Sequence, residues 1–273
     1  MANNQKQPKK SKSFTGIKSA GLVIAACFAL AVCIYIFVLG NPNNFVNHDP
    51  KNHPLDGNIY GLIYKGGVIV PIIQTLLLTV LSLSVERYFA IKTAFGKGKL
   101  VNFVKDIKNS LSKGDIKGAS EICDKQKGSV ANVVSSALIK YSEVEEDKTL
   151  SKEQQILAIQ KEVEEATALE LPMLSQNLPI IATIVTLGTL MGLLGTVIGM
   201  IKSFASLAGA GGTDSIALSA GISEALINTA FGIATGALAV ISYNYFTSKI
   251  DSITYSIDEV GFTIVQTFAA SHK

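Results

Sequence analysis

The chain has 273 residues, of which 48% are hydrophobic and only 16% are charged, and its formal net charge at pH 7 is +3. Soluble proteins average about 25% charged residues, so this composition argues against one or two ordinary soluble domains. The net charge is also too small for nucleic-acid binding, and the absence of Trp argues against a platform on which bases stack.

Four long stretches of the chain carry no Asp, Glu, Lys or Arg. Crossing a bilayer takes about 20 mostly apolar helical residues, and each stretch is long enough. The sequence therefore predicts an all-α integral membrane protein with four transmembrane helices and a helical cytoplasmic domain, embedded in the lipid bilayer. The charge-free stretches are residues 19–48, 66–85, 171–201 and 225–248.

The first apolar stretch is interpreted as a membrane helix that stays in the protein. Its run from Ala20 to Leu39 exceeds the 7–15 residues typical of the apolar region of a signal peptide. A lipoprotein cleavage box at Leu30-Ala31-Val32-Cys33 is the weaker alternative, because Val is bulky before the Cys and the run continues past it. Cys27, Cys33 and Cys123 define no disulfide framework.

Lysines set the expected orientation. Five of them precede the first span, and further lysines follow the second, so both flanks are assigned to the cytoplasmic side of the membrane. Both termini are then cytoplasmic. The predicted segments are a basic N-terminus (1–19), an extra span (20–40), an irregular periplasmic loop (41–65), a second span (66–92), a cytoplasmic helical region (93–177), a third span (178–207), a short periplasmic turn (208–220), a fourth span (221–247) and a cytoplasmic tail (248–273).

The polar region between the second and third spans is predicted to hold several helices. Helix breaks are expected at Lys113-Gly114-Asp115, at Lys127-Gly128-Ser129 and across 143–148. Apolar residues at helical spacing between Ser151 and Glu170 predict one long helix that runs directly into the third span.

Small and hydroxylated residues recur every three or four positions in three spans. Such a stripe lets helices approach closely, and for a single GxxxG pair packing is the default explanation. Three hydroxylated stripes leave a polar ion path equally open, while the first span, which has no such stripe, is expected to be peripheral. The candidate path residues are Thr189, Thr196, Asn228, Thr229 and Thr235, and the candidate packing residues are Gly192, Gly195, Gly199, Gly232 and Gly236.

Charged residues lie only near the ends of the spans. Glu224, at the outer end of the fourth span, is an interfacial carboxylate, a cap at the helix N-terminus, or a titratable group at the mouth of a pore. Glu86 and Arg87, at the inner end of the second span, are interpreted as an anchoring pair at the cytoplasmic boundary rather than as a proton relay. Because no acid lies near the middle of any span, a proton path would need a carboxylate from another polypeptide.

Enzyme motifs are not found. The Gly-rich run from Gly209 to Thr213 lacks the Lys of a phosphate-binding loop. His48, Asp49 and His53 make a weak metal site at best, and a solvated loop is the favoured interpretation. We therefore expect no enzymatic activity, no cofactor and no metal.

Three motifs resemble the MotA/TolQ/ExbB proton channel family. They are Gly66–Ile73 followed by Val85-Glu86-Arg87, the run Leu193–Phe204, and the run Gly221–Gly232, with Tyr243-Asn244 beyond it. The last two runs are the more specific, and the pattern is closer to ExbB than to the flagellar stator subunit.

The resemblance implies a homopentamer around helices of an ExbD-like partner that carries a membrane aspartate. It also implies that Thr196 and Thr229 line the pore, that Glu224 is functional, and that proton flow drives work passed through a TonB-like protein to outer-membrane uptake. A TolQ-like subunit for envelope integrity, or a scaffold that does not conduct, remains the alternative. The chain departs from the family at Gly188-Thr189, where an Ala-Pro pair is usual, and in its additional first span.

Overall fold

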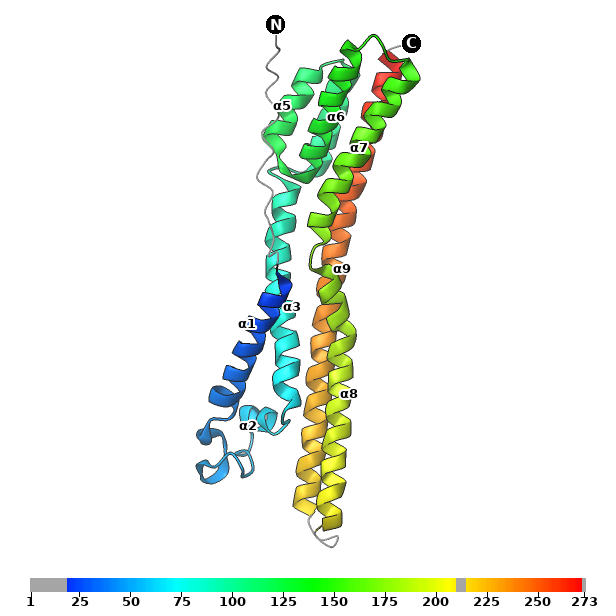
Figure 1. The fold of residues 1–273 in the computed structure, drawn as a ribbon. Helices are drawn as coiled ribbons and strands as arrows, with labels where there is room; N and C mark the ends of the chain where they lie inside the picture. Colours follow the sequence, from blue (N-terminus) through cyan, green and yellow to red (C-terminus); the bar gives the residue numbers. More distant parts are fainter. Residues whose placement is uncertain (1–18, 210–214, 272–273) are drawn as a thin grey trace. The chain divides into compact units, whose positions relative to one another are not determined.

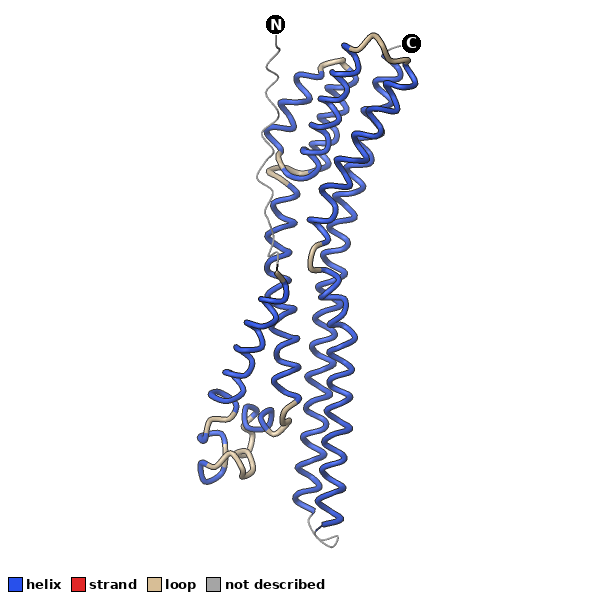
Figure 2. Tube along the Cα trace, viewed as in Figure 1, coloured by secondary structure: helices blue, strands red, loops and turns tan. Residues whose placement is uncertain are grey.

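The computed structural model describes residues 19–209 and 215–271 of the chain. Within these ranges every regular element is a helix, and the one exception is an isolated β-bridge between Phe45 and Pro54 (Figure 2). Four helical stretches are long and apolar enough to cross a membrane, which confirms the predicted all-α membrane fold. They are Ala20–Leu39, Ile69–Ser112, Lys152–Ala205 and Leu218–Ser271.

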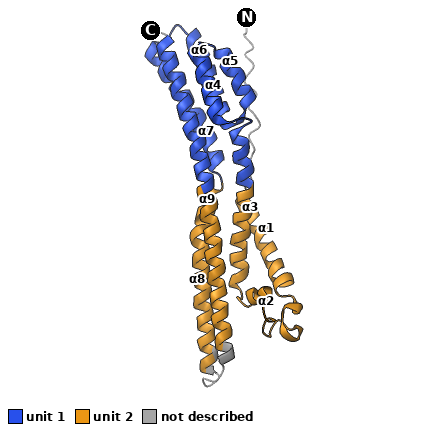
Figure 3. Ribbon diagram, turned by 180° about the vertical axis from the view of Figure 1, so that it is seen from behind, with its two compact units in different colours: residues 1–16, 86–176, 245–273 blue, residues 17–85, 177–244 orange. Residues whose placement is uncertain are grey.

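The helices form two compact units (Figure 3). The described part of unit 1 comprises residues 86–176 and 245–271, and that of unit 2 comprises 19–85, 177–209 and 215–244. In chain order the main helices are α1 (Ala20–Cys33), η1 (Ile34–Leu39), α2 (Ile59–Tyr64), α3 (Ile69–Phe95), α4 (Leu100–Ser112), α5 (Ile116–Gln126), α6 (Gly128–Glu146), α7 (Lys152–Ser175), α8 (Leu178–Gly209) and α9 (Ser215–Ser271). All of these except η1 and α4 are labelled in Figure 1, and α4 is labelled in Figure 3.

The first span and the loop after it belong to unit 2. Only Cys27 and Ala31 of α1 are buried, in keeping with a peripheral helix, and the Cys27 thiol lies 3.7 Å from the Ser82 hydroxyl of α3. The loop is more ordered than its Asn, Pro and Gly content predicts. It contains the 3₁₀ turns Pro42–Asn44 and Val46–His48 as well as α2.

Asparagine side chains give the loop its order. Asn44 donates to the carbonyls of Val38 and Leu39 at 2.9 and 3.0 Å, and these carbonyls at the end of η1 have no helical partner of their own. Asn58 caps α2 by accepting a bond from the Gly61 N–H at 3.0 Å. Among the residues described, no group of three or more His, Cys, Asp or Glu side chains is gathered closely enough to hold a metal ion, and the loop residues His48, Asp49 and His53 are within that range.

Unit 1 is held together by a conventional apolar core. Buried residues recur on one face of α9 at steps of three and four, which is the pattern of a helix with one face in a core. Tyr141 of α6 packs edge-on against Phe268 of α9, with ring centroids 4.8 Å apart. The buried face of α9 consists of Ile253, Ile257, Val260, Ile264 and Phe268.

The helix ends inside unit 1 match the predicted breaks. α4 ends at Ser112 before Gly114, whose φ is +71°, and Asp115 then caps α5 by accepting the Gly118 N–H at 2.8 Å. α5 gives way to α6 at Lys127 and Gly128. A capping box at Ser151, in which its side chain and that of Gln154 each bond the other's backbone N–H, starts α7.

Two predicted helix boundaries differ from the structure. The long helix from Ser151 does not run into the third span, because α7 ends at Ser175 and α8 begins at Leu178. Asn177 adopts a left-handed φ of 65°, and Pro179 has no N–H to donate back to Ser175. The segment expected as a tail from 248 onward is instead the second half of α9, which runs to Ser271.

Parts of three predicted segments lie outside the described residues. They are residues 1–18 of the basic N-terminus, 210–214 of the turn between the third and fourth spans, and 272–273 at the C-terminus.

We expect Cys123 to be unreactive in the folded protein. The side chain is buried in α5, and burial, with a smaller contribution from the Asp124 charge, raises the pKa of its thiol to about 12. At pH 8 almost none of it is thiolate, which is the reactive form. In a variant with Cys27 and Cys33 replaced by Ala, a membrane-permeant maleimide should label Cys123 only after unfolding in detergent.

The matched control introduces cysteine two positions away, as Lys125→Cys in a Cys123→Ala background. Lys125 is exposed on the same helix, so its replacement should be labelled rapidly in native membranes. Equal labelling rates at the two positions would contradict the burial of Cys123.

Candidate functional site

The antiparallel pair of α8 and α9 in unit 2 carries most of the candidate residues. Its glycines bring the two backbones into near contact. A Cβ built on Gly192 would lie 3.0 Å from the Asn228 carbonyl oxygen and 3.1 Å from the Cα of Gly232, and one on Gly199 would lie 2.8 Å from the Cβ of Ala225. The structure thus places all five candidate packing glycines, Gly192, Gly195, Gly199, Gly232 and Gly236, in this contact.

Replacing Gly232 by Ala should separate the two helices. The added Cβ would sit 2.5 Å from the Gly188 carbonyl oxygen and 2.6 Å from the Gly192 Cα, and these are backbone atoms that cannot rotate away. Overpacking of this kind costs about 1–3 kcal/mol, so we expect a lower thermal unfolding midpoint in detergent.

Gly21→Ala is the matched control, because a Cβ there meets nothing within 4 Å. This change in α1 should be neutral or slightly stabilising, since Ala favours a helix over Gly. A Gly232→Ala protein as stable as Gly21→Ala would show that the contact tolerates a larger separation.

The close approach brings two candidate path residues together. The Thr196 hydroxyl of α8 and the Thr229 hydroxyl of α9 are directly hydrogen-bonded. Thr196 also reaches the Gly192 carbonyl at 3.2 Å, and Thr229 reaches the Ala225 carbonyl at the same distance. Both side chains are only partly buried.

A pair of hydroxyls has a definite chemical capacity. Each can donate one hydrogen bond and accept two, so the pair can relay a proton in either direction or solvate a cation. Neither hydroxyl titrates near neutral pH. The pair therefore offers hydrogen-bonding hydroxyls but no group that stores a proton.

Thr196 also opens onto the outer face of α8. It lies in a shallow concavity of about 520 Å³ whose other lining residues are large and apolar. Leu193, Val197, Ile201 and Phe204 are each at least half exposed there. Thr196 thus contacts Thr229 of α9 on one side and lines the concavity on the outer face of α8 on the other.

The remaining candidate path residues lie in different environments. Thr235 is fully buried in the chain and bonds the Phe231 carbonyl at 2.9 Å. Thr189 is exposed and bonds the Val185 carbonyl at 3.1 Å. Both hydroxyls are therefore satisfied within their own helices, by carbonyls other than those that the Thr196–Thr229 pair uses.

Asn228 ties the pair of helices to the start of α3. Its side-chain N–H donates to the Gly66 carbonyl at 2.9 Å, and the side chain is 1% exposed. Its Oδ1 atom is buried and receives no hydrogen bond from the part of the chain that is described. The arrangement makes Asn228 a bridge between three segments rather than an open lining residue.

Glu224 is paired with a cation. Its Oε1 atom lies 2.7 Å from the Lys202 ammonium of α8, and the glutamate side chain is 15% exposed. Gly67, which has a φ of +70°, lies next to the Glu224 carboxylate, and a Cβ at this position would be 2.8 Å from the same carboxylate oxygen. Only glycine fits both this φ and this distance.

Lys202 was not singled out from the sequence, although a signal for it exists. Lys202 ends one charge-free stretch and Glu224 precedes the next, so the two charges mark the same level of two antiparallel helices. Opposite charges at such a level are natural partners. The pairing depends on the helices being neighbours, which spacing alone does not establish.

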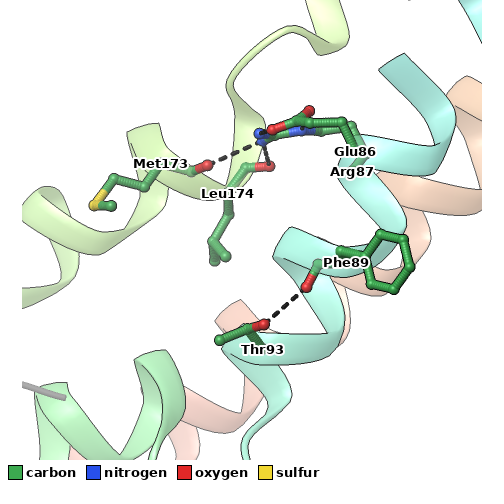
Figure 4. A network of polar contacts seen from close by, with 6 residues as sticks. All are labelled: Glu86, Arg87, Phe89, Thr93, Met173 and Leu174. Atoms are coloured by element: carbon green, nitrogen blue, oxygen red, sulfur yellow. Dashed lines mark hydrogen bonds and ion pairs between the residues drawn. The ribbon is translucent and has the colours of Figure 1, made fainter. Parts of the chain in front are cut away.

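Glu86 and Arg87 form a buried ion pair in unit 1 (Figure 4). The Glu86 and Arg87 side chains are 5% and 0% exposed, so the pair predicted to anchor the inner end of the second span is buried within the protein. Arg87 Nε donates to the Glu86 carboxylate at 2.6 Å, and its Nη1 donates to the carbonyls of Met173 and Leu174 at 3.0 and 3.2 Å. The pair thereby fastens α3 to the last turn of α7.

This contact satisfies groups that a helix leaves open. The last carbonyls of a helix have no partner within it, and a cation at that end also complements the helix dipole. A guanidinium can meet a carboxylate and two carbonyls at once because its donors form a rigid fork. The geometry therefore assigns Arg87 a structural role.

Comparison with known proteins identifies related sequences. The sequence model of the MotA/TolQ/ExbB proton channel family matches residues 128–259. The biopolymer transport protein ExbB-like 3 of Synechocystis sp. is 29% identical over 186 residues, which cover 67% of this chain and 82% of that protein.

Shorter matches reach two functional branches of the family. The Tol-Pal system protein TolQ of Haemophilus influenzae is 34% identical over 84 residues, covering 31% of this chain and 37% of that protein. The biopolymer transport protein ExbB of Salmonella typhimurium is 34% identical over 85 residues, covering 31% and 35%. The helical membrane fold, the motifs and these matches together support membership of the chain in the MotA/TolQ/ExbB proton channel family.

Proposed function

We propose that the chain is an ExbB-like subunit that conducts protons together with an ExbD-like membrane protein and converts the proton-motive force into mechanical work. The observation that carries the proposal is the Thr196–Thr229 hydroxyl pair in spans that have no acid near their middle. Thr196 and Thr229 line the path, and an aspartate of the partner stores the proton. The work reaches outer-membrane uptake through a TonB-like protein.

The physical logic rests on the cost of charge in lipid. An ionised carboxylate at the middle of a bilayer costs about 2.5–3.5 kcal/mol on insertion scales, and protonation removes that cost. Hydroxyls from several copies of this chain, arranged as a pentamer, lower the cost at defined positions around the partner helix. Alternate loading and release of the proton then favours successive positions in the ring.

The orientation in the proposal follows the lysines. The chain lies in the bacterial inner membrane with both termini in the cytoplasm, so Lys202 and Glu224 lie at the periplasmic end and unit 1 extends into the cytoplasm. The proposed activity is transport, and it needs no cofactor.

A TolQ-like subunit in an envelope-integrity system is the second candidate, because TolQ and ExbB relatives match the chain at the same identity. Deletion of the gene separates them. Loss of energised uptake with an intact envelope supports the ExbB-like role, and leakage of periplasmic proteins with normal uptake supports the TolQ-like role.

The test of the assembly is to purify the chain with the product of the neighbouring gene and count subunits by native mass spectrometry. We expect five copies of this chain around partner helices that carry an aspartate. A monomer, or a ring that holds no second polypeptide, would contradict the proposal.

Glu224 offers a further prediction, because the pairing and the functional roles of its carboxylate can be separated. Lys202→Glu places two carboxylates together and should impair both folding and transport. The swapped double variant Lys202→Glu/Glu224→Lys restores an ion pair, so stability should recover. Transport should remain impaired, because the carboxylate now lies on α8.

The measurements are thermal unfolding in detergent and energised uptake by whole cells. If the swapped variant transports as well as the original chain, the ion pair alone matters and the carboxylate at 224 has no separate function.

A further inference from the structure

A groove lies between α3 and α9 within unit 1, and the proton path does not use it. It encloses about 210 Å³. Its floor is apolar, since Ile91 and Phe246 are each 4% exposed. Tyr88 of α3 and Tyr245 of α9 form its walls, and both are about half exposed. Phe95 also lines the groove.

Two lysines lie over the aromatic walls. The Lys92 ammonium is 5.9 Å from the centre of the Tyr88 ring, and the Lys249 ammonium is 5.7 Å from that of Tyr245. Both lysines line the groove, and both are exposed. Cation–π contact holds each ammonium near the rim while leaving its other side open to a ligand.

The groove carries net positive charge. Its lining contains two lysines and no acid, and neither lysine takes part in an ion pair within the described ranges. The nearest acid after Lys249 in the sequence is Asp251, and residues two apart on a helix do not face each other. The rim therefore suits an anion.

The sequence places the groove where the spans leave the hydrocarbon. Lys249 is the first charged residue after the charge-free stretch 225–248, and Lys92 is the first lysine after the stretch 66–85. Tyrosine rings and lysine ammonium groups with apolar stems are characteristic of the level of the lipid headgroups. An apolar floor with a basic rim at this level matches a molecule that is itself apolar at one end and anionic at the other.

We propose that this groove binds an anionic phospholipid, with the phosphate between Lys92 and Lys249 and the start of an acyl chain over Ile91 and Phe246. Basic pockets between transmembrane helices on the cytoplasmic side are a recognised form of lipid-headgroup site. The site is independent of the proposed proton path, because none of the residues that line it belongs to the α8–α9 contact.

The test uses the full chain in its native assembly, purified from membranes and examined by native mass spectrometry with phosphatidylglycerol or phosphatidylcholine added. We expect preferential retention of phosphatidylglycerol. Two surface charges contribute about 1 kcal/mol each, so Lys92→Gln/Lys249→Gln should lower that retention by about tenfold or more.

The matched control is Lys97→Gln/Lys99→Gln, which removes the same charge from exposed positions a few residues further along. It should leave lipid retention unchanged within about twofold. Equal retention of the two lipids by the unaltered chain, or equal losses in the two double variants, would overturn the proposal.

A photoreactive amino acid in place of Phe95 gives a second readout that does not depend on charge. Illumination in membranes should produce a lipid adduct. Crosslinking to a neighbouring copy of the chain instead would assign the groove to a contact between subunits and would also overturn the lipid proposal.

Discussion

Replacing Arg87 with Met is expected to lower the free energy of unfolding by about 3–5 kcal/mol, the usual cost of removing one partner of a buried ion pair. The side chain is fully buried, and its loss removes the guanidinium that pairs with the Glu86 carboxylate, which is itself only 5% exposed. The carbonyls of Met173 and Leu174 also lose their guanidinium donor. The measurement is chemical or thermal unfolding of the purified protein in detergent.

Two further variants identify the cause. Lys161→Met breaks an ion pair with Glu165 in which both side chains are more than half exposed, and such pairs contribute about 0.3–0.5 kcal/mol. Glu86→Gln/Arg87→Met also removes the negative charge of the Glu86 carboxylate, so this double variant should be more stable than Arg87→Met alone. An Arg87→Met protein no less stable than Lys161→Met would contradict the buried clamp between α3 and α7.

Replacing Thr196 or Thr229 with Val is expected to lower proton flux by about ten- to a hundredfold while the protein still assembles. Valine has nearly the same shape as threonine, so the α8–α9 contact is retained. A polar passage that loses a hydroxyl leaves the proton or water beside it without a partner, which costs about 1–3 kcal/mol in proteins. Each 1.4 kcal/mol on a barrier is a factor of ten in rate.

Flux is measured in proteoliposomes that contain the chain and the proposed aspartate-bearing partner. Thr183→Val is the matched control, since this exposed hydroxyl bonds only the Pro179 carbonyl of its own helix, at 2.8 Å. It should conduct normally. Unchanged flux in the Thr196 and Thr229 variants would support a scaffold whose stripes serve only to pack helices.

Much of the fold can be predicted from the sequence, because the controlling interactions are local. A bilayer demands long charge-free helices, so four such stretches predict four spans. Glycine at regular spacing predicts a close contact, and the structure has one between α8 and α9. Breaks at Gly114 and Gly128 follow from the positive φ that these glycines adopt.

The second half of α9 was assigned to a tail, although its apolar residues recur at helical spacing. Ile253, Ile257, Val260 and Ile264 are the signal that could have revealed it. When the sequence is divided into a span and a tail at the predicted membrane boundary, a helix that continues past this boundary is missed.

Tertiary pairings are harder to predict, because they depend on which helices become neighbours. The sequence around Glu86 and Arg87 predicts an anchoring pair at the membrane boundary but does not reveal that the pair is buried. They are buried where α7 packs against α3, and the α7 carbonyls that Arg87 contacts lie 86 and 87 residues further along the chain. The Lys202–Glu224 pair and the Asn228 bridge to Gly66 have the same origin.

In the proposed mechanism this chain supplies a hydroxyl-lined passage and another polypeptide supplies the acid, so proton flux requires both. The most direct measurement is pH-driven proton flux into liposomes that contain the chain alone, the chain with its partner, or the chain with a partner whose membrane aspartate is changed to asparagine. We expect proton flux only in the liposomes that contain the chain together with the unaltered partner. Equal flux through the chain alone would contradict it.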